Sequence, residues 1–401
     1  MAPRSEPGLG ANRLSGPLEA RAIAAAVVGR VLRSGAYSNV LVQKASGHLS
    51  PQDRARAKAL VFGVLRRLEA IDEAIEAGAQ RRVDALDAEV VDRLRVSTFE
   101  ILYSELATPI SVSAGVDLVR DGAPRATGLA NATLRRISHM DRPVADGLVL
   151  PDWLIDRLTS EWGMEQTHSF ARASADEPER IVRIRSGGTA GYAGIEGALA
   201  AEPGPLPEGA VVQDAASIAA GNVVEAAPGM KVLDMAAAPG GKTLHLIDQV
   251  GAGGVVVALD RHQRRVMDGA RRVPGARWVV ADGTAPPFPK GSFERILLDA
   301  PCSGLGTLRR RPEIRFRVNQ ADVVALATIQ HRMLEVAFDL LAPGGRLVYS
   351  VCTVTPEETV EVSKDFDLEP AHLPGLIWGN GRLLAPHVTS TDGMFVAVHQ
   401  A

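Results

Sequence analysis

The chain has 401 residues, which is too long for one ordinary domain and predicts two or three separate cores. Its hydrophobic fraction of 46% and charged fraction of 23% are typical of a soluble globular protein, and no apolar run is long enough to predict a membrane span. Residues 1–150 hold 20 basic and 17 acidic side chains, a net charge of +3, whereas the remainder holds 24 and 30, a net charge of −6. A polyanionic partner would therefore be bound by local basic patches rather than by the field of the whole protein.

Cysteine and histidine usage indicates a reducing compartment and chemistry without a metal. The chain holds two cysteines, Cys302 and Cys352, which are too few for a disulfide framework. Its nine histidines show no spacing typical of metal ligands, and two cysteines on separate segments do not form a zinc site. We therefore expect a cytoplasmic monomer that binds neither a metal nor a membrane.

The N-terminal third is predicted to be helical after a short tail. Residues 1–16 are rich in Pro, Gly and small side chains, without the apolar segment of a signal peptide, which predicts a disordered tail. Ser50 followed by Pro51 is typical of a helix N-cap with proline in the first turn. Over residues 17–140, which we predict to be an all-helical bundle, apolar side chains recur at helical spacing: Ile23, Val27, Val31, Leu60, Val64, Leu68, Ile71, Val91, Leu94 and Ile101.

A break in composition separates this bundle from the rest of the chain. Asp, Pro and Gly cluster at residues 141–150, which predicts a linker. Residues 151–205 begin with a predicted helix, Trp153 to Trp162, and continue with an alternating segment at Arg180–Arg185, so we expect a small α+β adaptor. In residues 206–401, the apolar runs KVLDM, VVVAL, RWVVA, RILLD and RLVYS alternate with helix-like segments. This alternation predicts an α/β domain with a doubly wound parallel sheet.

The first of these strands is followed by a loop suited to a nucleotide. The strand carries Asp234, and small residues precede a helix that starts near Lys242. Small side chains allow close approach of the backbone, and the helix N-terminus offers free N–H groups. Asp260 ends the second strand, where an acid accepts hydrogen bonds from ribose, and Asp282 follows the third, a position suited to the amine of an adenine. Acids at successive strand ends favour a nucleotide site over an ordinary glycine-rich turn.

An NTPase is the main alternative for this loop, because APGGKT followed by ILLDAP resembles a Walker A and Walker B pair. The P-loop requires a glycine five residues before Gly241, and that position is Ala236, which lacks the conformational freedom of glycine. An NTPase would also leave Asp260 unexplained. Both points count against the NTPase.

The two cysteines lie just past the ends of the fourth and fifth predicted strands, in RILLDAPCSGLG and RLVYSVCTVTPEE. Neighbouring strand ends border the ligand crevice of a doubly wound sheet, so Cys302 and Cys352 are expected to converge beside the cofactor. A single buried cysteine usually serves as a small hydrophobic residue. Two cysteines at such positions favour catalysis instead.

Paired thiols suit methyl transfer to carbon 5 of a pyrimidine, which is a poor nucleophile. Addition of a thiolate at carbon 6 makes the ring an enamine, whose carbon 5 can attack a sulfonium methyl group. A base then removes the proton from carbon 5, and elimination frees the enzyme. Asp299, three residues before Cys302, is placed to bond N3 and the amino edge of a cytosine and so to stabilise the charge of the adduct.

Four sequence blocks resemble the RNA cytosine-5 methyltransferases, specifically the bacterial ribosomal RsmB (Sun/Fmu) group. They are VLDMAAAPGGKT, DAPCSGLGTLRRRPEIRFR, LLAPGGRLVYSVCTVTPEE and the terminal TDGMFVA. In the helical region, ARAKALVFGVLRRLEAID and ATGLANATLRRI are similar to the NusB-like RNA-binding domain that this group carries. The resemblance spans most of residues 20–400. It implies a class I methyltransferase sheet, S-adenosylmethionine as cofactor and small-subunit ribosomal RNA as substrate.

The resemblance also implies roles for individual residues. Cys352 falls on the family's nucleophile, and Cys302 falls on the cysteine that assists release. In one departure, Val351 stands before the nucleophile where threonine is usual. The family's cofactor residues fall on Ala236, Ala237, Ala238, Pro239, Gly240, Gly241, Lys242, Asp260, Asp282 and Asp299.

Two groups of arginines are candidates for RNA contacts. Phosphate binding is the natural use of basic side chains beside an active site, although a solvated charge run is the simpler alternative. Phe316 is a candidate for stacking on a base, and the target cytosine must leave any helix to reach Cys352. The first group follows the Cys302 segment: Arg309, Arg310, Arg311, Arg315 and Arg317. The second lies in the helical region: Arg125, Arg135 and Arg136, with Asn131.

Two other functions stay open at this point. The changed Val351 allows a NusB-like RNA-binding or antitermination factor whose methyltransferase domain has lost catalysis. Alternatively, the same chemistry acts on transfer RNA or on DNA, because an arginine cluster does not select between these polyanions.

Overall fold

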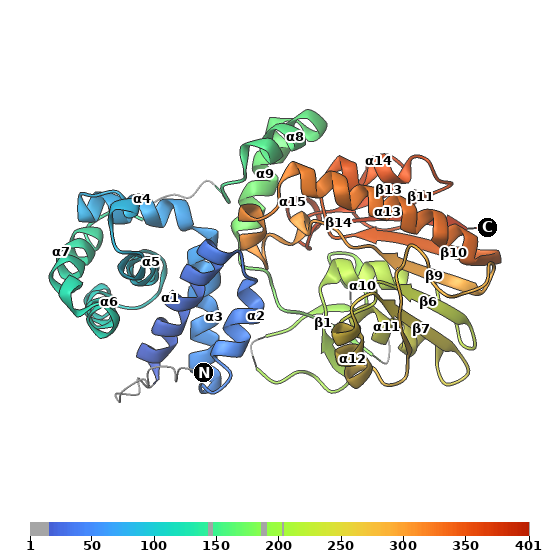
Figure 1. Ribbon diagram of the computed structural model, residues 1–401, viewed down its shortest axis with the longest axis horizontal. Coiled ribbons are helices and arrows are strands. Elements are labelled where there is room, and N and C mark those ends of the chain that lie inside the picture. Colours follow the sequence, from blue (N-terminus) through green and yellow to red (C-terminus); the bar gives the residue numbers. More distant parts are fainter. Residues whose placement is uncertain (1–15, 143–146, 186–190, 203, 401) are drawn as a thin grey trace, which may run out of the picture. The chain divides into compact units, whose positions relative to one another are not determined.

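The computed structural model describes residues 16–142, 147–185, 191–202 and 204–400 (Figure 1). Contacts within the chain divide it into two compact units, Met1–Asp146 and Gly147–Ala401. Apart from Gly16, the predicted tail lies outside the described residues, as does the middle of the predicted linker, 143–146. No helix among the described residues combines the length and the apolar character needed to cross a membrane.

The first unit is all-helical, as the sequence predicts, and has a hydrophobic core of its own. The predicted N-cap is present, because the Ser50 hydroxyl accepts a hydrogen bond from the backbone N–H of Asp53 at 3.1 Å. Leu60, Val64 and Leu94, three of the residues at helical spacing, are buried in the core. The helices are α1 (Pro17–Ser34), α2 (Ser38–Ala45), α3 (Pro51–Arg66), α4 (Leu68–Ala79), α5 (Ala88–Tyr103), α6 (Thr108–Gly122) and α7 (Thr127–Ile137), with short turns η1 (Val83–Ala85) and η2 (Pro124–Ala126).

The second unit opens with helices, continues through short strands and ends in the large sheet. Its first part holds α8 (Asp152–Trp162), α9 (Met164–Ala175), β1 (Ile181–Ile184), β2 (Gly191–Tyr192), β3 (Ile195–Glu196), β4 (Ala198–Ala200), β5 (Ala210–Val212) and α10 (Ala215–Asn222). Its middle holds β6 (Lys231–Met235), α11 (Gly241–Val250), β7 (Val255–Asp260), α12 (Gln263–Arg272), β8 (Arg277–Val280), β9 (Phe293–Asp299), η3 (Leu305–Thr307) and η4 (Pro312–Phe316). Its last part holds α13 (Gln320–Leu340), β10 (Leu341–Val351), η5 (Pro356–Glu358), α14 (Val360–Ser363), β11 (Glu369–Pro370), β12 (Leu376–Trp378), β13 (Gly381–Leu384), α15 (Pro386–Thr389) and β14 (Met394–Gln400).

The predicted doubly wound sheet is confirmed, but it is mixed rather than purely parallel. The five predicted strands are β6 to β10, and they run parallel in the order β10-β9-β6-β7-β8. Beyond β10 the sheet continues antiparallel through β14, β13 and β12, and β11 also pairs with β14. The connection from Leu384 to Met394 is shorter than the dozen or so residues that a parallel crossover needs, so β14 returns antiparallel to β13.

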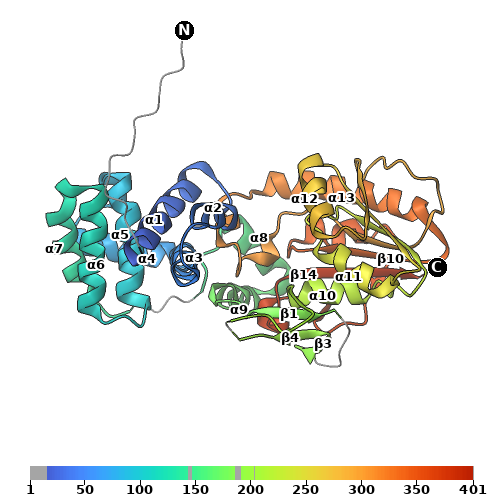
Figure 2. The same cartoon turned by 90° about the horizontal axis from the view of Figure 1, so that it is seen from below.

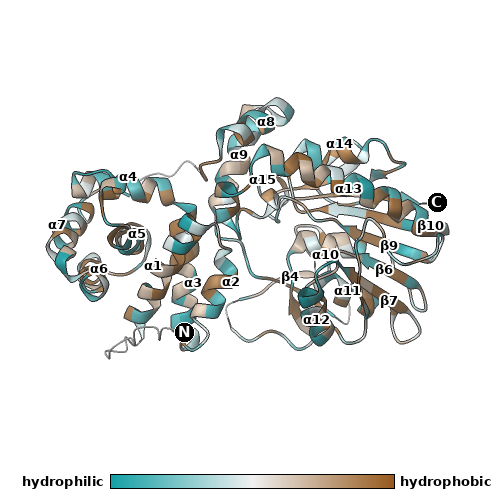
Figure 3. Ribbon diagram, viewed as in Figure 1, coloured by the Kyte–Doolittle hydropathy of each residue, from teal (hydrophilic) through white to brown (hydrophobic). Residues whose placement is uncertain are grey.

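Alternate residues of the central strands feed two cores, one on each face of the sheet. Leu233 of β6 packs in the cluster that holds Leu334 of α13. Val232, its neighbour in the chain, packs in the other cluster, which holds Leu246 of α11. Figure 3 shows the hydrophobic character of these strands beside the hydrophilic helix α12. Because both faces are covered, the strand ends are where side chains of the sheet can meet a ligand.

A small three-stranded sheet, in the order β4-β1-β5, lies beside α10 in the second unit (Figure 2). Arg183 of β1 binds Asp248 of α11 at 2.8 Å, and Arg185 binds the other oxygen of the same carboxylate at 2.8 Å. These ion pairs join the region predicted as an adaptor to the helix that follows the nucleotide-type loop.

Candidate active site

The loop between β6 and α11 takes the conformation of a tight ligand-binding turn. Gly240 has a φ of 103°, and Ala236 has a φ of 61°. Ala236 therefore takes a left-handed conformation that was expected only of a glycine at this position. The Ala237 N–H donates to the carbonyl of Leu259 at 2.8 Å, which helps to hold the loop against the end of β7 despite the cost of the left-handed residue.

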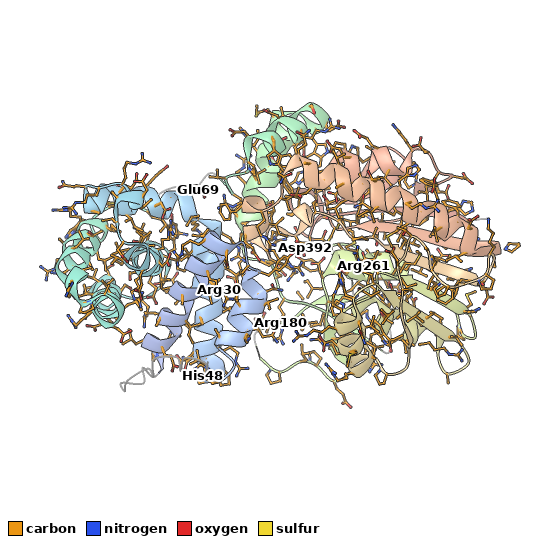
Figure 4. The ribbon with its side chains drawn as sticks, in the orientation of Figure 1. Arg30, His48, Glu69, Arg180, Arg261 and Asp392 are labelled. Atoms are coloured by element: carbon orange, nitrogen blue, oxygen red, sulfur yellow. The ribbon has the colours of Figure 1, made fainter. Side chains whose placement is uncertain are left out.

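Three of the predicted cofactor residues share one cavity. Ala236, Asp260 and Asp282 line a cavity of about 150 Å³, together with Pro301 and Met333. Arg261, labelled in Figure 4, lines it too. The walls combine two strand-end carboxylates with apolar side chains, which is the composition expected of a site for an adenosine group.

The carboxylates at the strand ends have different environments. Asp234 is fully buried, which raises its pKa to about 7, although the Thr243 hydroxyl donates to it at 2.6 Å. Asp260 accepts hydrogen bonds from the backbone N–H groups of Ala238 and His262. The N–H and hydroxyl of Thr284 lower the pKa of Asp282.

Lys242 and Asp299, predicted from different sequence blocks, form one polar group. The Lys242 Nζ lies 2.8 Å from one carboxylate oxygen of Asp299, and the Ser350 hydroxyl donates to the other at 3.0 Å. Burial opposes the charge on Lys242, but the Asp299 carboxylate outweighs it and the pKa of Lys242 is raised. Ser350 was not predicted, because its role depends on the parallel pairing of β9 with β10.

The two thiols converge as the strand positions predict. The Sγ atoms of Cys302 and Cys352 lie 3.2 Å apart. Cys302 follows β9 and Cys352 follows β10, and these strands are neighbours in the sheet. Thiols from two distant parts of the sequence are therefore in direct contact.

The environment makes Cys352 the more acidic of the two thiols. Its pKa is lowered, chiefly because Cys302 donates a hydrogen bond to it, and the charges of Lys242 and Arg311 act in the same direction. Burial and the Asp299 carboxylate oppose this shift. The pKa of Cys302 is raised well above its usual value by the same hydrogen bond and by burial. Of the two thiols, Cys352 is thus the one that loses its proton more readily.

A buried carboxylate that the sequence did not reveal connects the segments that carry the two thiols. Glu358 of η5 is fully buried. One of its oxygens accepts from the Ser303 N–H at 2.7 Å and from Gln330 Nε2 at 3.1 Å. The other accepts from the hydroxyls of Ser303, Thr353 and Thr355 at 2.6, 2.9 and 2.8 Å. In the sequence, the hydroxyl residues before Glu358 are a weak signal, since only the fold brings Ser303 to them.

Fewer arginines of the first group are available for RNA contacts than the sequence suggests. Arg309 and Arg315 are buried, and they donate to the backbone carbonyls of Ser390 and Val149 respectively. Phosphate binding by these two side chains does not fit their burial. Phe316 is partly exposed, and the Arg315 guanidinium lies 4.2 Å from the centre of its ring.

The other arginines of this group divide between structure and surface. Arg310 lies between two carboxylates, Asp214 and Asp392, at 2.8 Å from each (Figure 4 labels Asp392). Arg311 is exposed, and its charge reaches Cys352. Arg317 is partly buried. Arg311 is therefore the member of the group best placed to meet a polyanion beside the thiols.

In the helical unit, the second arginine group lies on α7 and on the turn before it. Arg125 and Arg135 are exposed, and Arg135 and Asn131 line a cavity of about 760 Å³ between α6 and α7. Arg136 donates to the carbonyl of Gly78 at 2.7 Å. Arg136 thus also links α7 to α4.

Comparison with known proteins identifies the family. A family model described as 16S rRNA methyltransferase RsmB/F matches residues 222–400, and one described as the NusB family matches residues 18–139. Ribosomal RNA small subunit methyltransferase B of Thermus thermophilus is 35% identical, covering 86% of each chain. The protein of the same name from Pseudomonas putida is 30% identical, covering 94% of this chain and 97% of that one. The chain belongs to the ribosomal RNA small subunit methyltransferase B family.

Solved structures confirm the fold of this family member. The crystal structure of PH0851 aligns with a TM-score of 0.74 at 23% identity, covering 96% of this chain and 99% of that one. NSun6 from Pyrococcus horikoshii, solved with SFG, aligns with a TM-score of 0.52 at 19% identity, covering 62% and 98%. These structures confirm the predicted fold class, and the relatives named above confirm the predicted family.

The described residues also bear on two smaller points. They contain no group of three or more His, Cys, Asp or Glu side chains arranged to hold a metal ion. Val351, which departs from the threonine usual in the family, is fully buried in the core on the α13 face of the sheet. The hydroxyl of Thr353, on the other side of Cys352, bonds Glu358 instead of facing a ligand.

Proposed function

We propose that this protein transfers a methyl group from S-adenosylmethionine to carbon 5 of a cytosine in small-subunit ribosomal RNA, through a covalent adduct on Cys352. The family supports the reaction and the class of RNA. The observation that carries the residue roles is the 3.2 Å contact between the two sulfurs, with Cys352 the more acidic.

The residues around the cavity fit the cofactor. Asp260 and Asp282 offer carboxylates for the ribose and the adenine, and Gly240 takes a left-handed conformation that a larger residue would strain. One oxygen of the buried Asp234 has no hydrogen-bond partner among the described residues, so a polar group is still to be satisfied beneath this loop. When bound, S-adenosylmethionine supplies the methyl group that carbon 5 accepts.

The thiols carry the covalent steps. The Cys352 thiolate adds to carbon 6 of the cytosine, which makes carbon 5 nucleophilic. We assign the amino group of the ring, a donor, to the Asp299 carboxylate, whose charge Lys242 balances. The proton that N3 takes up as the thiolate adds comes from solvent and is returned when Cys352 leaves. Once Cys352 is bonded to carbon, Cys302 loses the hydrogen bond that most raises its pKa, which favours transfer of its proton to water although burial still opposes that transfer. The Cys302 thiolate then removes the proton from carbon 5, and the returning electron pair restores the ring double bond and expels Cys352.

The RNA contacts are assigned to local basic surfaces. We propose that Arg311 binds a phosphate next to the target nucleotide and that Arg317 and Phe316 extend this surface. We propose that the helical unit, residues 17–140, is a second RNA-binding module, with Arg125 and Arg135 on its surface. The target cytosine lies in a loop or an unfolded strand, because a stacked base does not reach a thiol.

A pair of single substitutions tests the proposal. Cys302→Ala, incubated with cofactor and unmodified small-subunit ribosomal RNA, is expected to accumulate a protein–RNA adduct, because release is blocked while attack, although slower, still proceeds. Cys352→Ala is expected to give no adduct and no methylated RNA. The measurements are denaturing electrophoresis for the adduct and bisulfite sequencing for the methylated position.

The same assay separates the alternatives. If Cys352→Ala retains methyl transfer, the assigned nucleophile is wrong. If the parent protein binds no S-adenosylmethionine in calorimetry, a non-catalytic RNA-binding function replaces the proposal. Transfer RNA serves as the control substrate, and preferential methylation of transfer RNA would overturn the assignment of ribosomal RNA.

A further inference from the structure

The buried carboxylate of Glu358 has a place in the structure that packing alone does not explain. It accepts five hydrogen bonds, and all of them come from Ser303, Thr353, Thr355 and Gln330. Among the described residues it forms no ion pair. Burial of an unpaired carboxylate is costly unless hydrogen bonds satisfy it, so this array of donors stabilises a charged group inside the unit.

The positions of these donors link the two thiols. Ser303 directly follows Cys302, and Thr353 directly follows Cys352. A single carboxylate oxygen accepts from both hydroxyls, which also lie 2.8 Å from each other. The residue that follows each thiol is thus bonded through its hydroxyl to one and the same oxygen of Glu358.

The same array also holds the segment on the near side of Cys302. Gln330 of α13 donates through its Nε2 to the carbonyl of Pro301 at 2.9 Å as well as to Glu358. The Cys302 segment is therefore bound at the residue before the thiol and at the residue after it. Among the described residues, the Sγ atoms themselves are hydrogen-bonded to each other, so the position of each thiol depends on the bonds of its neighbours in the chain.

We propose that Glu358 is a positioning residue that sets the separation of the two thiols by binding the Cys302 and Cys352 segments to one carboxylate. This inference rests on the proposed function, since it concerns how the nucleophile and the releasing group are kept in register. Its role is mechanical: the hydrogen bonds set the separation of the thiols, and the negative charge, which adds to the raised pKa of Cys302, does not set it. Misplacement of reacting groups by about 1 Å can lower a rate by about 100-fold.

Glutamine at this position distinguishes the hydrogen bonds from the charge. One side of the carboxylate faces N–H donors, and the other faces three hydroxyls. Hydroxyls accept as well as donate, so the amide of Glu358→Gln can direct its oxygen to the N–H groups and its NH₂ to the hydroxyls. Leucine offers similar bulk and no hydrogen bonds. A positioning role therefore predicts that Glu358→Gln works and Glu358→Leu does not.

The test measures single-turnover methyl transfer to small-subunit ribosomal RNA and calorimetric binding of S-adenosylmethionine, in the full chain. We expect Glu358→Gln to keep the rate within about tenfold of the parent and Glu358→Leu to lower it about 100-fold, each with unchanged cofactor affinity and unchanged KM for RNA. Asn380→Ala is the matched control. It removes hydrogen bonds that hold Ser363 of α14, in the segment just after Glu358, without touching either thiol segment, and it is expected to keep the parental rate.

Each alternative outcome overturns the inference. If Glu358→Gln loses as much rate as Glu358→Leu, the charge is what matters. If Glu358→Leu keeps the parental rate, or if its cofactor affinity falls in step with its rate, Glu358 does not position the thiols. Should Glu358→Leu fail to fold, the double variant Ser303→Ala, Thr353→Val replaces it and must show the same loss of rate with intact cofactor binding. A parent protein without methyl transfer would overturn the proposed function instead, so the two failures are distinguishable.

Discussion

The acid–base character of the two thiols comes from their contact with each other. The strand positions of Cys302 and Cys352 predict that they converge, and the 3.2 Å distance agrees. Their order of acidity is not predictable from the residues alone, because it depends on Lys242, Arg311 and Asp299, which the fold brings to them. The sequence therefore predicts which residues react, and only the structure shows how their pKa values are shifted.

Removal of Cys302 is expected to shift the reactivity of Cys352 to higher pH. Cys302 lowers the pKa of Cys352 by donating a hydrogen bond, so Cys302→Ala raises that pKa and reduces the thiolate fraction near neutral pH. The measurement is the rate of Cys352 alkylation by iodoacetamide as a function of pH, followed by peptide mass spectrometry without RNA. Cys302→Ser is the control: its hydroxyl can still donate, so its profile should lie between those of the parent and Cys302→Ala. If the midpoint of the Cys302→Ala profile lies at the parental pH or below it, Cys302 is not the hydrogen-bond donor that lowers the pKa of Cys352.

At the scale of elements, the central strands are predictable and the edge of the sheet is not. The parallel strands are apolar runs, largely buried except for the edge strand β8, and each is found where expected. The antiparallel strands beyond β10 were not predicted. Strands β11, β12 and β13 are two to four residues long, and β14 is buried almost throughout, so none shows the alternation that identifies a strand. Glu358 was missed for a related reason, since its partners come from three separate elements.

Backbone contacts among three elements fix the position of the segment after Cys302. The N–H of Gly306 in η3 donates to the carbonyl of Cys352 at 3.0 Å, and the N–H of Gly393, just before β14, donates to the carbonyl of Gly306 at 2.7 Å. A Cβ on Gly306 would lie 2.1 Å from the Gly393 carbonyl oxygen. The nearest atoms are all backbone atoms of Gly393, so no flexible side chain can move aside and Gly306 is needed for this close approach.

Alanine at Gly306 is therefore expected to damage stability and activity together. The added methyl group must push η3 away from β14, at a cost of about 1–3 kcal/mol in the free energy of unfolding, and it moves the carbonyl partner of Cys352. Gly253→Ala is the matched control, because its nearest contact is an ordinary 3.8 Å and its activity should be unchanged. Urea unfolding followed by tryptophan fluorescence reports the second unit, which holds all four tryptophans, and methyl transfer reports the site. If Gly306→Ala has the same free energy of unfolding as the parent, the backbone of Gly306 does not lie this close to Gly393.

At the scale of the whole molecule, the described residues form separate hydrophobic cores for the two units. Leu60, Val64 and Leu94 belong to a cluster confined to the helical unit. The clusters on the two faces of the sheet begin at Leu148 and Ile181 and contain residues of the second unit alone. The cavity, the thiols and Glu358 also belong to the second unit. The proposed chemistry and the helical unit, which we propose to bind RNA, thus belong to different cores.

Separate cores predict that residues 147–401 fold and bind cofactor without the helical unit. Every described residue that lines the cavity or bonds to Asp299 or Glu358 is retained, so the affinity for S-adenosylmethionine should stay within about threefold of the full chain, measured by calorimetry. Affinity for small-subunit ribosomal RNA should fall at least about tenfold, because one of two linked binding surfaces is lost and with it the gain from binding both at once. The steepness of the salt dependence should fall as well, since fewer phosphates are neutralised. Unchanged RNA affinity in this fragment would mean that the helical unit does not contribute to RNA binding. If the fragment loses cofactor binding but still shows a cooperative unfolding transition by tryptophan fluorescence, the cofactor site needs residues outside the second unit.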